Sequence, residues 1–431
     1  MKVVIIGNHA AGLSAAETLR KLDLSCDITV ISKEDVPPYS RSLIHYIVSG
    51  EKQVNDILFK PLDFYKKNSI NTIFGTEVIR VISKDKMVLL SGDKKVAYDA
   101  LIIATGGNPA ALNISGEKTK GVFCFRTIQD ARQIIDYCDN VDTAIVLGGG
   151  LVGLKAAVAL CKRGKKVKIM VTSPNVLSQI ISNKEAEIFE EYLVELGIEI
   201  VSRTSPSIIL GKEKVEGIET TEGKKIECQM VIIGKGVRAN KNIVKGTDIK
   251  TQYGIIVDEH CQTSVPDIYA AGDVTQSQDD IRKEKWMNAL WPHAVEEGRV
   301  AAENILGKKT VLRKRTSMNS LTFKNIAIIS CGLTGLREKI EGGEEISIRG
   351  PGKRDCKRFI LKDNRLIGFS LVGDIAHAGV LTSLATKEIN IEKIKELFIS
   401  GKYNFANMLP LIKENREKFK EPEYDEVLAF L

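Results

Sequence analysis

The chain has 431 residues, of which 43% are hydrophobic and 27% are charged, and its formal net charge is +7. A chain of this length exceeds one ordinary domain, so two or three are expected, and the composition is ordinary for a globular enzyme. No stretch approaches about 18 uninterrupted apolar residues, so no membrane span is expected. The mild charge gives no reason to expect a nucleic-acid partner.

The first residues form an apolar strand at once, from Lys2 to Gly7, which leaves no room for a signal peptide and predicts a cytoplasmic protein. The eight cysteines are scattered, without a C-x-x-C pair or a spacing suited to a metal. No metal site is therefore expected, and buried apolar side chains are the main interpretation of these thiols.

A βαβ unit opens the chain, with strands over residues 2–7 and 27–32 and a helix over residues 13–21 between them. About 30 residues in this order are typical of a dinucleotide-binding fold. The loop after the first strand is a variant of the usual glycine motif, because His9 stands where the middle glycine normally lies. We expect the backbone N–H of His9, rather than its ring, to serve a pyrophosphate.

The end of the second strand is a second departure from the usual pattern. An acid normally holds the adenosine ribose there, whereas this chain has Ser32, with Glu34 and Asp35 just beyond. A serine hydroxyl can still bond a ribose hydroxyl, although more weakly than a carboxylate. Arg41, in the proline-marked loop that follows, is a candidate for the phosphates or the adenine side of a nucleotide, with a plain surface arginine as the alternative.

Residues 54–68 are predicted to be helical, and residues 70–95 to hold short strands. The segment 98–107 is a buried strand that ends in glycines. Asparagine, proline and polar residues over 108–120 then mark a crossover, where a domain boundary is expected.

The centre of the chain carries a complete glycine motif. Four apolar residues precede Gly148, Gly150 and Gly153, which match G-x-G-x-x-G, and a helix of small residues follows. The first glycine permits the sharp turn, the second lets the backbone approach a pyrophosphate, and the third lets the helix pack closely on the strand. The helix N-terminus also offers N–H groups and a partial positive charge to phosphates.

A strand over residues 166–172, a helix over 184–196 and short strands up to residue 233 complete a second α/β domain. At the end of the first of these strands, an acid is typical of NAD enzymes and a nearby arginine of NADP enzymes, and Thr172 is neither. The pattern changes from about Met318 to strands at 326–330, 345–348, 359–361 and 366–372, followed by two or three helices. This part has no glycine-rich phosphate loop and predicts a third, α+β domain.

Four signatures occur in a fixed order, at Gly7–Gly12, Ala104–Gly106, Gly148–Gly153 and Thr263–Asp273. Over essentially the whole chain, this order resembles the flavoproteins of the pyridine nucleotide–disulfide oxidoreductase family. The resemblance implies an α/β fold with two Rossmann-like dinucleotide-binding domains, in which an FAD domain is split by an inserted NAD(P) domain, and a C-terminal α+β interface domain. The implied bounds are 1–112 and 247–317 for the FAD domain, 113–246 for the NAD(P) domain and 318–431 for the interface domain.

By the same resemblance, Asp273 accepts a hydrogen bond from a ribityl hydroxyl of FAD, and the preceding glycine clears space for the pyrophosphate. The helix around Trp291–Val295 presents its N-terminus near the pyrimidine side of the flavin. Motifs and resemblance together give the following cofactor-binding residues: Gly7, His9, Ala10, Ala11, Gly12, Ser32, Arg41, Ala104, Thr105, Gly106, Gly148, Gly150, Leu151, Val152, Gly153, Thr172, Gly236, Gly272, Asp273, Pro292 and Ala294.

Within the family, the chain is most similar to the branch of NADH:rubredoxin reductases, the flavin part of nitrite reductases and the NADH-oxidising subunits of 2-oxoacid oxidoreductases. The disulfide reductases carry one or two redox cysteines just after the second strand, whereas residues 37–50 contain none. The resemblance therefore implies that electrons pass from NADH, with NADPH as the less expected donor, through FAD to a redox protein or partner subunit. An oxidase that uses O₂ and a non-catalytic flavin redox sensor are the alternatives, and a homodimer is left open.

Lys155 stands where many relatives have a glutamate that pairs with a lysine near flavin N5, and residues 41–50 lack that lysine. The helix dipole disfavours a cation on the first turn of a helix, so this place suggests a functional reason. We expect Lys155 to act near N5 as a catalytic residue, with a solvated helix lysine as the alternative. The basic residues of Arg313–Arg315 and Arg349–Arg358 are a candidate docking face for an acidic carrier, or simply solubilising charge.

Overall fold

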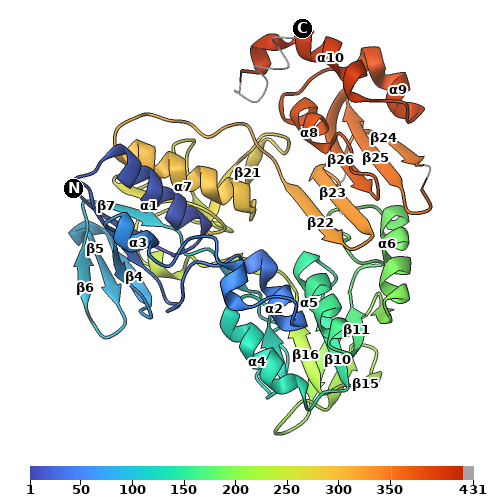
Figure 1. Cartoon of the computed structure of the whole chain (residues 1–431), viewed down its shortest axis with the longest axis horizontal. Coiled ribbons are helices and arrows are strands. Elements are labelled where there is room, and N and C mark those ends of the chain that lie inside the picture. Colours follow the sequence, from blue (N-terminus) through green and yellow to red (C-terminus); the bar gives the residue numbers. More distant parts are fainter. Residues whose placement is uncertain (337, 339, 351, 421–431) are drawn as a thin grey trace. The chain divides into compact units, whose positions relative to one another are not determined.

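The computed structural model describes residues 1–336, 338, 340–350 and 352–420 (Figure 1). The chain separates into two compact units, which are described one after the other. The first unit takes in Met1–Thr172, Leu196–Gln278 and Glu284–Arg313. The second takes in Ser173–Glu195, Asp279–Lys283 and Lys314–Leu431.

A five-stranded parallel sheet forms the first part of the first unit, in the order β19-β7-β1-β2-β3. Its strands are β1 (Lys2–Ile6), β2 (Asp27–Ile31), β3 (Asn71–Ile73), β7 (Ala100–Ile103) and β19 (Ile268–Ala270). Because β19 pairs with β7 in parallel, the sheet is completed only when the chain returns from an inserted segment. The first sheet is thus split in sequence, as expected.

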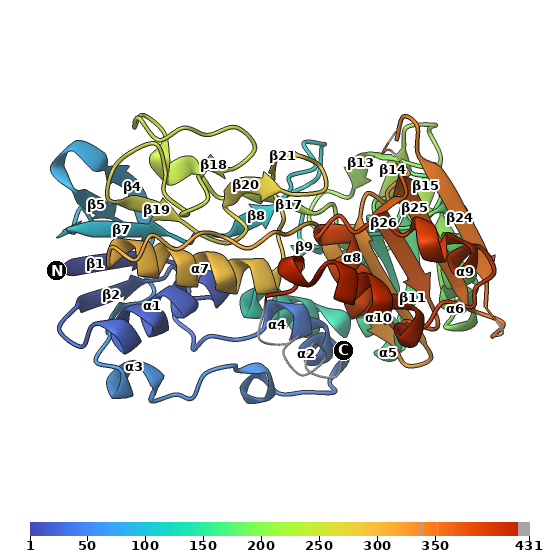
Figure 2. The ribbon, with the colours of Figure 1, turned by 90° about the horizontal axis from the view of Figure 1, so that it is seen from above.

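Two helices cover one face of this sheet, α1 (Ala10–Leu22) and α7 (Trp291–Ile305). They lie side by side in both views of the ribbon (Figures 1 and 2), although they come from opposite ends of the unit's sequence. Their small and aliphatic residues share one buried core with the strands below, which explains why the return segment docks here.

A second parallel sheet has the order β12-β11-β10-β16-β9. Its strands are β9 (Val122–Cys124), β10 (Thr143–Leu147), β11 (Lys166–Met170), β12 (Ile198–Val201) and β16 (Met230–Ile233). Helix α5 (Leu151–Lys162) packs on it, and α4 (Ile128–Cys138) precedes β10. Both Rossmann-type sheets predicted from the two glycine loops are therefore present.

Smaller elements complete the first unit. Two antiparallel sheets are formed by β4 (Val78–Ile82), β5 (Met87–Leu90) and β6 (Lys95–Ala97), and by β13 (Pro206–Leu210), β14 (Gly217–Thr220) and β15 (Lys225–Glu227). A third small sheet has β18 (Ile255–Ile256), β20 (Thr275–Asp279) and β21 (Glu284–Trp286). The two crossovers between the parallel sheets pair with one another, as β8 (Gly107–Pro109) and β17 (Val237–Ala239).

The expected helix over residues 54–68 is wrong. The structure has a 3₁₀ turn, η2 (Val54–Ile57), and a single helical turn, α3 (Phe64–Lys67). Pro61 lies between them, and proline lacks a backbone N–H and disfavours helical geometry in the residue before it. Two further short helices, η1 (Arg41–Leu43) and α2 (Ile44–Ser49), precede this segment.

The second unit contains a five-stranded antiparallel sheet in the order β22-β23-β26-β25-β24. Its elements are β22 (Met318–Phe323), β23 (Ile326–Gly332), β24 (Glu344–Arg349), β25 (Cys356–Lys362), β26 (Arg365–Val372), α8 (Ala378–Thr386), α9 (Lys395–Ile399) and α10 (Phe405–Glu414). The α+β character matches the expectation, although the sequence analysis missed β22. Helix α6 (Asn183–Glu195) also belongs to this unit, where its Phe189 stacks on Phe323 with ring centroids 6.0 Å apart.

The described helices include none that is long and apolar enough to cross a membrane.

Candidate cofactor sites

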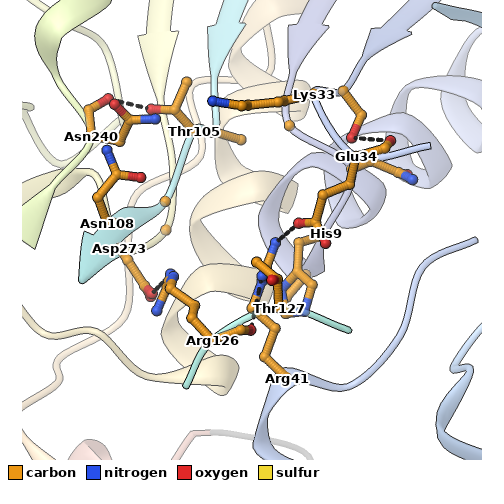
Figure 3. A pocket seen from close by; sticks show the side chains of 18 of the residues that line it. His9, Lys33, Glu34, Arg41, Thr105, Asn108, Arg126, Thr127, Asn240 and Asp273 are labelled. Carbon is orange, nitrogen blue, oxygen red and sulfur yellow. Dashed lines mark hydrogen bonds and ion pairs between the residues drawn. The ribbon is translucent and has the colours of Figure 1, made fainter. Parts of the chain in front are cut away.

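A cavity of about 950 Å³ opens at the carboxyl edge of the first sheet (Figure 3). In open parallel sheets, this edge is where ligands bind, and the volume is at the upper end of ordinary ligand pockets. The expected cofactor-binding residues that line it are Gly7, His9, Ala10, Ala11, Ser32, Arg41, Ala104, Thr105, Gly106, Gly272, Asp273 and Ala294. Residues separated by most of the chain therefore meet in one place.

Gly7 and Gly12 build the turn beneath this cavity. Gly7 has a φ of +125°, and a Cβ there would lie 2.0 Å from the carbonyl oxygen of Ala104. A Cβ at Gly12 would lie 2.0 Å from the Gly7 oxygen, so Gly12 serves helix packing rather than the cavity lining. His9 has φ −136° and ψ −163°, an extended backbone that any residue adopts, which explains why this middle position tolerates a side chain.

His9 is half-buried, and its ring packs among other residues of the loop region. Its Nε2 donates a hydrogen bond to the Tyr39 carbonyl at 2.9 Å, and the ring packs edge-on against Trp291 and Phe59, with centroids 4.8 and 5.6 Å away. Burial, with a smaller effect of the Arg41 charge, lowers the pKa of His9 to about 3. The side chain is neutral at physiological pH, and the backbone of α1's first turn is left to meet a ligand's phosphates.

Arg41 is fixed at the cavity wall by a network of polar side chains. It forms an ion pair with Glu34 and donates to the Arg126 carbonyl at 3.1 Å. The Tyr39 hydroxyl donates to Glu34 at 2.6 Å, and burial raises the pKa of that phenol. Ser32 donates to the Glu34 carbonyl at 3.0 Å and keeps its lone pairs for a ribose hydroxyl.

Arg126 is a cavity residue that the sequence analysis missed. Its guanidinium lies 3.3 Å from the Asp273 carboxylate, as Figure 3 shows, with the two side chains 19% and 26% exposed. Burial lowers the pKa of Arg126, and the Asp273 charge opposes that shift. Its local sequence signals only a helix start, because Thr127 and Asp130 form the capping box of α4.

The backbone N–H of the glycine before Asp273 is bonded to a buried carboxylate. Glu297 of α7 is 3% exposed and accepts the Gly272 N–H at 2.6 Å and the Thr275 hydroxyl at 3.0 Å. On the other side of the cavity, the Thr105 hydroxyl donates to the Asn240 carbonyl at 2.7 Å. Pro292, exposed in the first turn of α7, does not line the cavity, whereas Ala294 does.

The second glycine loop lies at the carboxyl edge of the second sheet. Gly148 has a φ of +113°, and a Cβ at Gly153 would lie 2.0 Å from the Gly148 oxygen. A Cβ at Gly150, by contrast, would meet no described atom within 4 Å. Gly150 caps α5, whose first residues are Leu151 and Val152. The turn, the close packing and the open middle position thus match the three roles predicted for these glycines.

Thr172 and Gly236 flank this loop, each following one of the two strands that pair with β10. Thr172 follows β11, and its hydroxyl lies 3.1 Å from that of Ser205. Gly236 follows β16 with a φ of +86°. Together with the loop at Gly148–Gly153, they form a second set of expected residues outside the 950 Å³ cavity.

Lys155 lies on α5 next to α2. Its ammonium donates to the carbonyl of Ser42 at 3.1 Å, and Ser42 lines the cavity, whereas Lys155 does not. Burial lowers the pKa of Lys155, and burial together with this charge lowers the pKa of His45 to about 4. A partly desolvated cation therefore stands directly behind the cavity wall.

Thiol chemistry has weak support here. None of the eight cysteines, all of which lie within the described residues, forms a disulfide, and the segment where disulfide reductases carry theirs contributes Arg41 and Ser42 to the wall. Cys124 is the one cysteine among the cavity residues, and burial raises its pKa, which keeps it a thiol rather than a nucleophilic thiolate. Among the described residues, no group of three or more His, Cys, Asp or Glu side chains could hold a metal ion.

The candidate docking face is only partly available. Arg315 and Arg358 are only 4% and 9% exposed, and Lys357 is paired with Asp374 at 2.6 Å. Four of its residues are exposed, namely Arg313, Lys314, Arg349 and Lys353. A docking face therefore stays a prediction that rests on these four charges.

Two glycine loops on two parallel sheets, with a ligand-sized cavity at one of them, define a protein that binds two dinucleotides. Residues 1–298 match the family described as pyridine nucleotide-disulphide oxidoreductase, and the chain belongs to that family.

Named relatives agree with this assignment. An NADH oxidase of Methanocaldococcus jannaschii is 34% identical over 403 residues, which cover 86% of this chain and 88% of that protein. An NADH-rubredoxin oxidoreductase of Clostridium acetobutylicum is 28% identical over 400 residues, covering 92% and 97%. The solved structure of an NAD-dependent persulfide reductase from A. fulgidus superposes with a TM-score of 0.87 at 25% identity, covering 92% of this chain and 79% of that one.

The chain is accordingly a flavin-dependent NAD(P)H oxidoreductase with FAD and NAD(P)H as its cofactors. The residues present fit FAD. The Gly7 turn leaves the backbone bare beside the cavity, the N-termini of α1 and α7 both reach it, and Arg41 and Arg126 supply cations for a pyrophosphate.

Proposed function

We propose that this enzyme passes the electrons it takes from NAD(P)H to a separate redox protein or partner subunit, and not to a cysteine of its own. The observation that carries the proposal is the cavity wall. Its segment at residues 37–50 contains Arg41 and Ser42 but no thiol, and Cys124 is held as a thiol by burial.

The residues of the first site would hold FAD. Bound FAD supplies the chemistry, because it accepts a hydride and can release the electrons one at a time. With FAD bound, Asp273 would accept from a ribityl hydroxyl in place of Arg126, and Arg126 would then be available to the pyrophosphate. The first turn of α7, where Trp291 and Ala294 line the cavity, brings the positive end of that helix dipole to it, which would stabilise negative charge there.

The second glycine loop holds the nicotinamide nucleotide. Its open position at Gly150 and the N-terminus of α5 face the phosphates. Lys155 lies two residues beyond Gly153, and its bond to the Ser42 carbonyl joins the helix of the second loop to the wall of the first cavity. We assign it the role of a cation that stabilises the charge arising when hydride arrives in the cavity.

The proposed acceptor is a small redox protein of the rubredoxin or ferredoxin kind, or a redox subunit. The Clostridium acetobutylicum relative is named for rubredoxin, and it matches nearly the full length of this chain. A cytoplasmic location and a homodimer, which the family resemblance leaves open, belong to the same proposal.

The test is an acceptor screen with purified holoenzyme. With NADH or NADPH as donor, the rate of rubredoxin or ferredoxin reduction is measured anaerobically, and the rate of O₂ consumption is measured separately in air. We expect the first rate to be at least about tenfold higher than the second. Fast O₂ consumption with slow carrier reduction would overturn the proposed acceptor.

An oxidase is the second candidate, because the relative with 34% identity is named NADH oxidase. In that case O₂ alone supports the full rate of NAD(P)H oxidation, and added redox proteins do not increase that rate. A non-catalytic flavin sensor is disfavoured by the intact second loop, and it predicts that NADH and NADPH bleach the flavin only very slowly.

A further inference from the structure

Two hydroxyls and a cation meet at the carboxyl end of β11. The Thr172 hydroxyl lies 3.1 Å from that of Ser205, and the ammonium of Lys235 donates to Thr172 Oγ1 at 3.3 Å. The strand ends in Val171 and Thr172 rather than in an acid, and the facing loop over residues 202–205 contains no Asp or Glu either. This end of the second sheet is therefore positive and lined with hydrogen-bonding hydroxyls.

The arrangement is fixed by backbone pairing. The N–H of Val171 donates to the Val201 carbonyl, and the N–H of Thr204 donates to the Val171 carbonyl, both at 2.9 Å. The loop after β12, which also carries the exposed Arg203, is thereby held against the end of β11.

Lys235 reaches this place from the far side of β10. It follows β16, and β16 and β11 pair with β10 on opposite sides. Its side chain must therefore cross the carboxyl edge of β10, where the Gly148–Gly153 loop begins, to reach Thr172. Burial lowers the pKa of this ammonium. Residues 171, 172 and 202–205 include no carboxylate that could pair with it.

In dinucleotide folds, the end of the second strand meets the adenosine ribose. A carboxylate there favours the free 2′-hydroxyl and repels a 2′-phosphate, whereas a cation with hydroxyl donors has the opposite preference. We infer that Lys235, Thr172 and Ser205 bind the 2′-phosphate of NADPH, so that the second site prefers NADPH over NADH. This rests on the proposed function only in taking the second loop as the NAD(P)H site.

The inference differs from the expectation of NADH that came from the family branch. The strand end alone, where Thr172 is neutral, favours neither nucleotide. Lys235 lies more than sixty residues further along the chain, so its approach to Thr172 could not be seen in the motif.

The experiment measures anaerobic flavin reduction in the holoenzyme by stopped flow, with NADH and NADPH in parallel. We expect the apparent Kd for NADPH to be at least about tenfold lower than that for NADH. In Lys235→Gln, the Kd for NADPH should rise at least about tenfold while that for NADH changes less than about threefold. Lys66→Gln, an exposed lysine on α3, is the matched control and should change neither value.

Adenosine 2′,5′-bisphosphate and adenosine 5′-monophosphate, as competitive inhibitors, separate the ribose contact from the rest of the nucleotide. The bisphosphate should bind more tightly, and Lys235→Gln should abolish the difference. An equal loss for both nucleotides in Lys235→Gln would place Lys235 at the pyrophosphate and overturn the inference, as would a preference for NADH. If neither nucleotide reduces the flavin, the proposed function itself fails, and that outcome is distinct from a preference for NADH.

Discussion

His9 stands at a place where dinucleotide loops normally have glycine, and its ring is accommodated by its neighbours. The backbone there is extended, and the side chain turns to the Tyr39 carbonyl and to Trp291. The imidazole is thereby removed from water and kept neutral. A loop that departs from the usual motif can therefore still leave its backbone next to the cavity.

This burial predicts an acid-sensitive contribution to stability. The pKa of His9 is about 3 in the folded chain, whereas an unperturbed histidine has a pKa of about 6.5, so the unfolded chain binds the extra proton between these values. Stability from the neutral ring is present above pH 6.5 and is lost as pH falls, by up to about 1.4 kcal/mol per pH unit. In His9→Gln, the thermal midpoint should fall less steeply between pH 7.5 and 5 than in the parent. Parallel curves for the two proteins would contradict the assignment of a buried neutral imidazole.

Lys155 is the residue whose proposed role depends most on its charge. In Lys155→Met, which keeps much of the stem, the limiting rate of flavin reduction at saturating nucleotide should fall at least about tenfold, since electrostatic stabilisation is lost. Lys162→Met, on the same helix and paired with Glu51, should change that rate less than about twofold. An unchanged rate in Lys155→Met would leave Lys155 as a structural partner of Ser42.

At the scale of elements, the two glycine loops share one construction. In each, the first glycine has a positive φ and the last packs against the first one's carbonyl, as seen for Gly7 with Gly12 and Gly148 with Gly153. They differ only in the middle, where His9 and Gly150 stand. The second loop alone thus has a bare middle position.

This difference gives a paired prediction for the second loop. Gly150→Ala should fold with nearly parental stability, within about 0.5 kcal/mol, because its φ of −80° suits alanine and no described atom crowds the methyl group. It should nevertheless raise the KM for the nucleotide severalfold, because the methyl group occupies the approach of the pyrophosphate. Gly153→Ala should instead lower the thermal midpoint clearly, since its Cβ would lie 2.0 Å from a carbonyl oxygen. Equal thermal midpoints for the two variants would contradict these roles.

At the scale of the whole molecule, the local signals predicted both parallel sheets and their loops. The strands around Gly7 and Gly148 are short-range patterns, in which apolar runs end in glycines, and such patterns can be detected from a window of sequence. The pairing of β8 with β17 and the arrival of Arg126 beside Asp273 depend on contacts between distant segments. Single-sequence patterns carry no information on such contacts, so neither the place of Arg126 beside the cavity nor the burial of Arg358 could be predicted.

The domain bounds expected from sequence stay predictions. The two compact units of the structure divide the chain at other residues. The segment with α6 lies within the expected bounds 113–246, yet it clusters with the antiparallel sheet of the second unit. The aromatic contact between Phe189 and Phe323 accounts for this grouping. An amphipathic helix reveals from sequence that it has an apolar face, but not which sheet that face covers.

The central claim is that electrons leave from FAD without passing through a cysteine pair, and counting electrons tests it most directly. Anaerobic titration of the holoenzyme with NADPH or dithionite, followed by flavin absorbance, gives the reducing capacity per FAD. We expect one two-electron equivalent to reduce the flavin completely, before and after alkylation of accessible thiols. A requirement for a second equivalent, lost on alkylation, would reveal a redox-active cysteine centre and contradict the account.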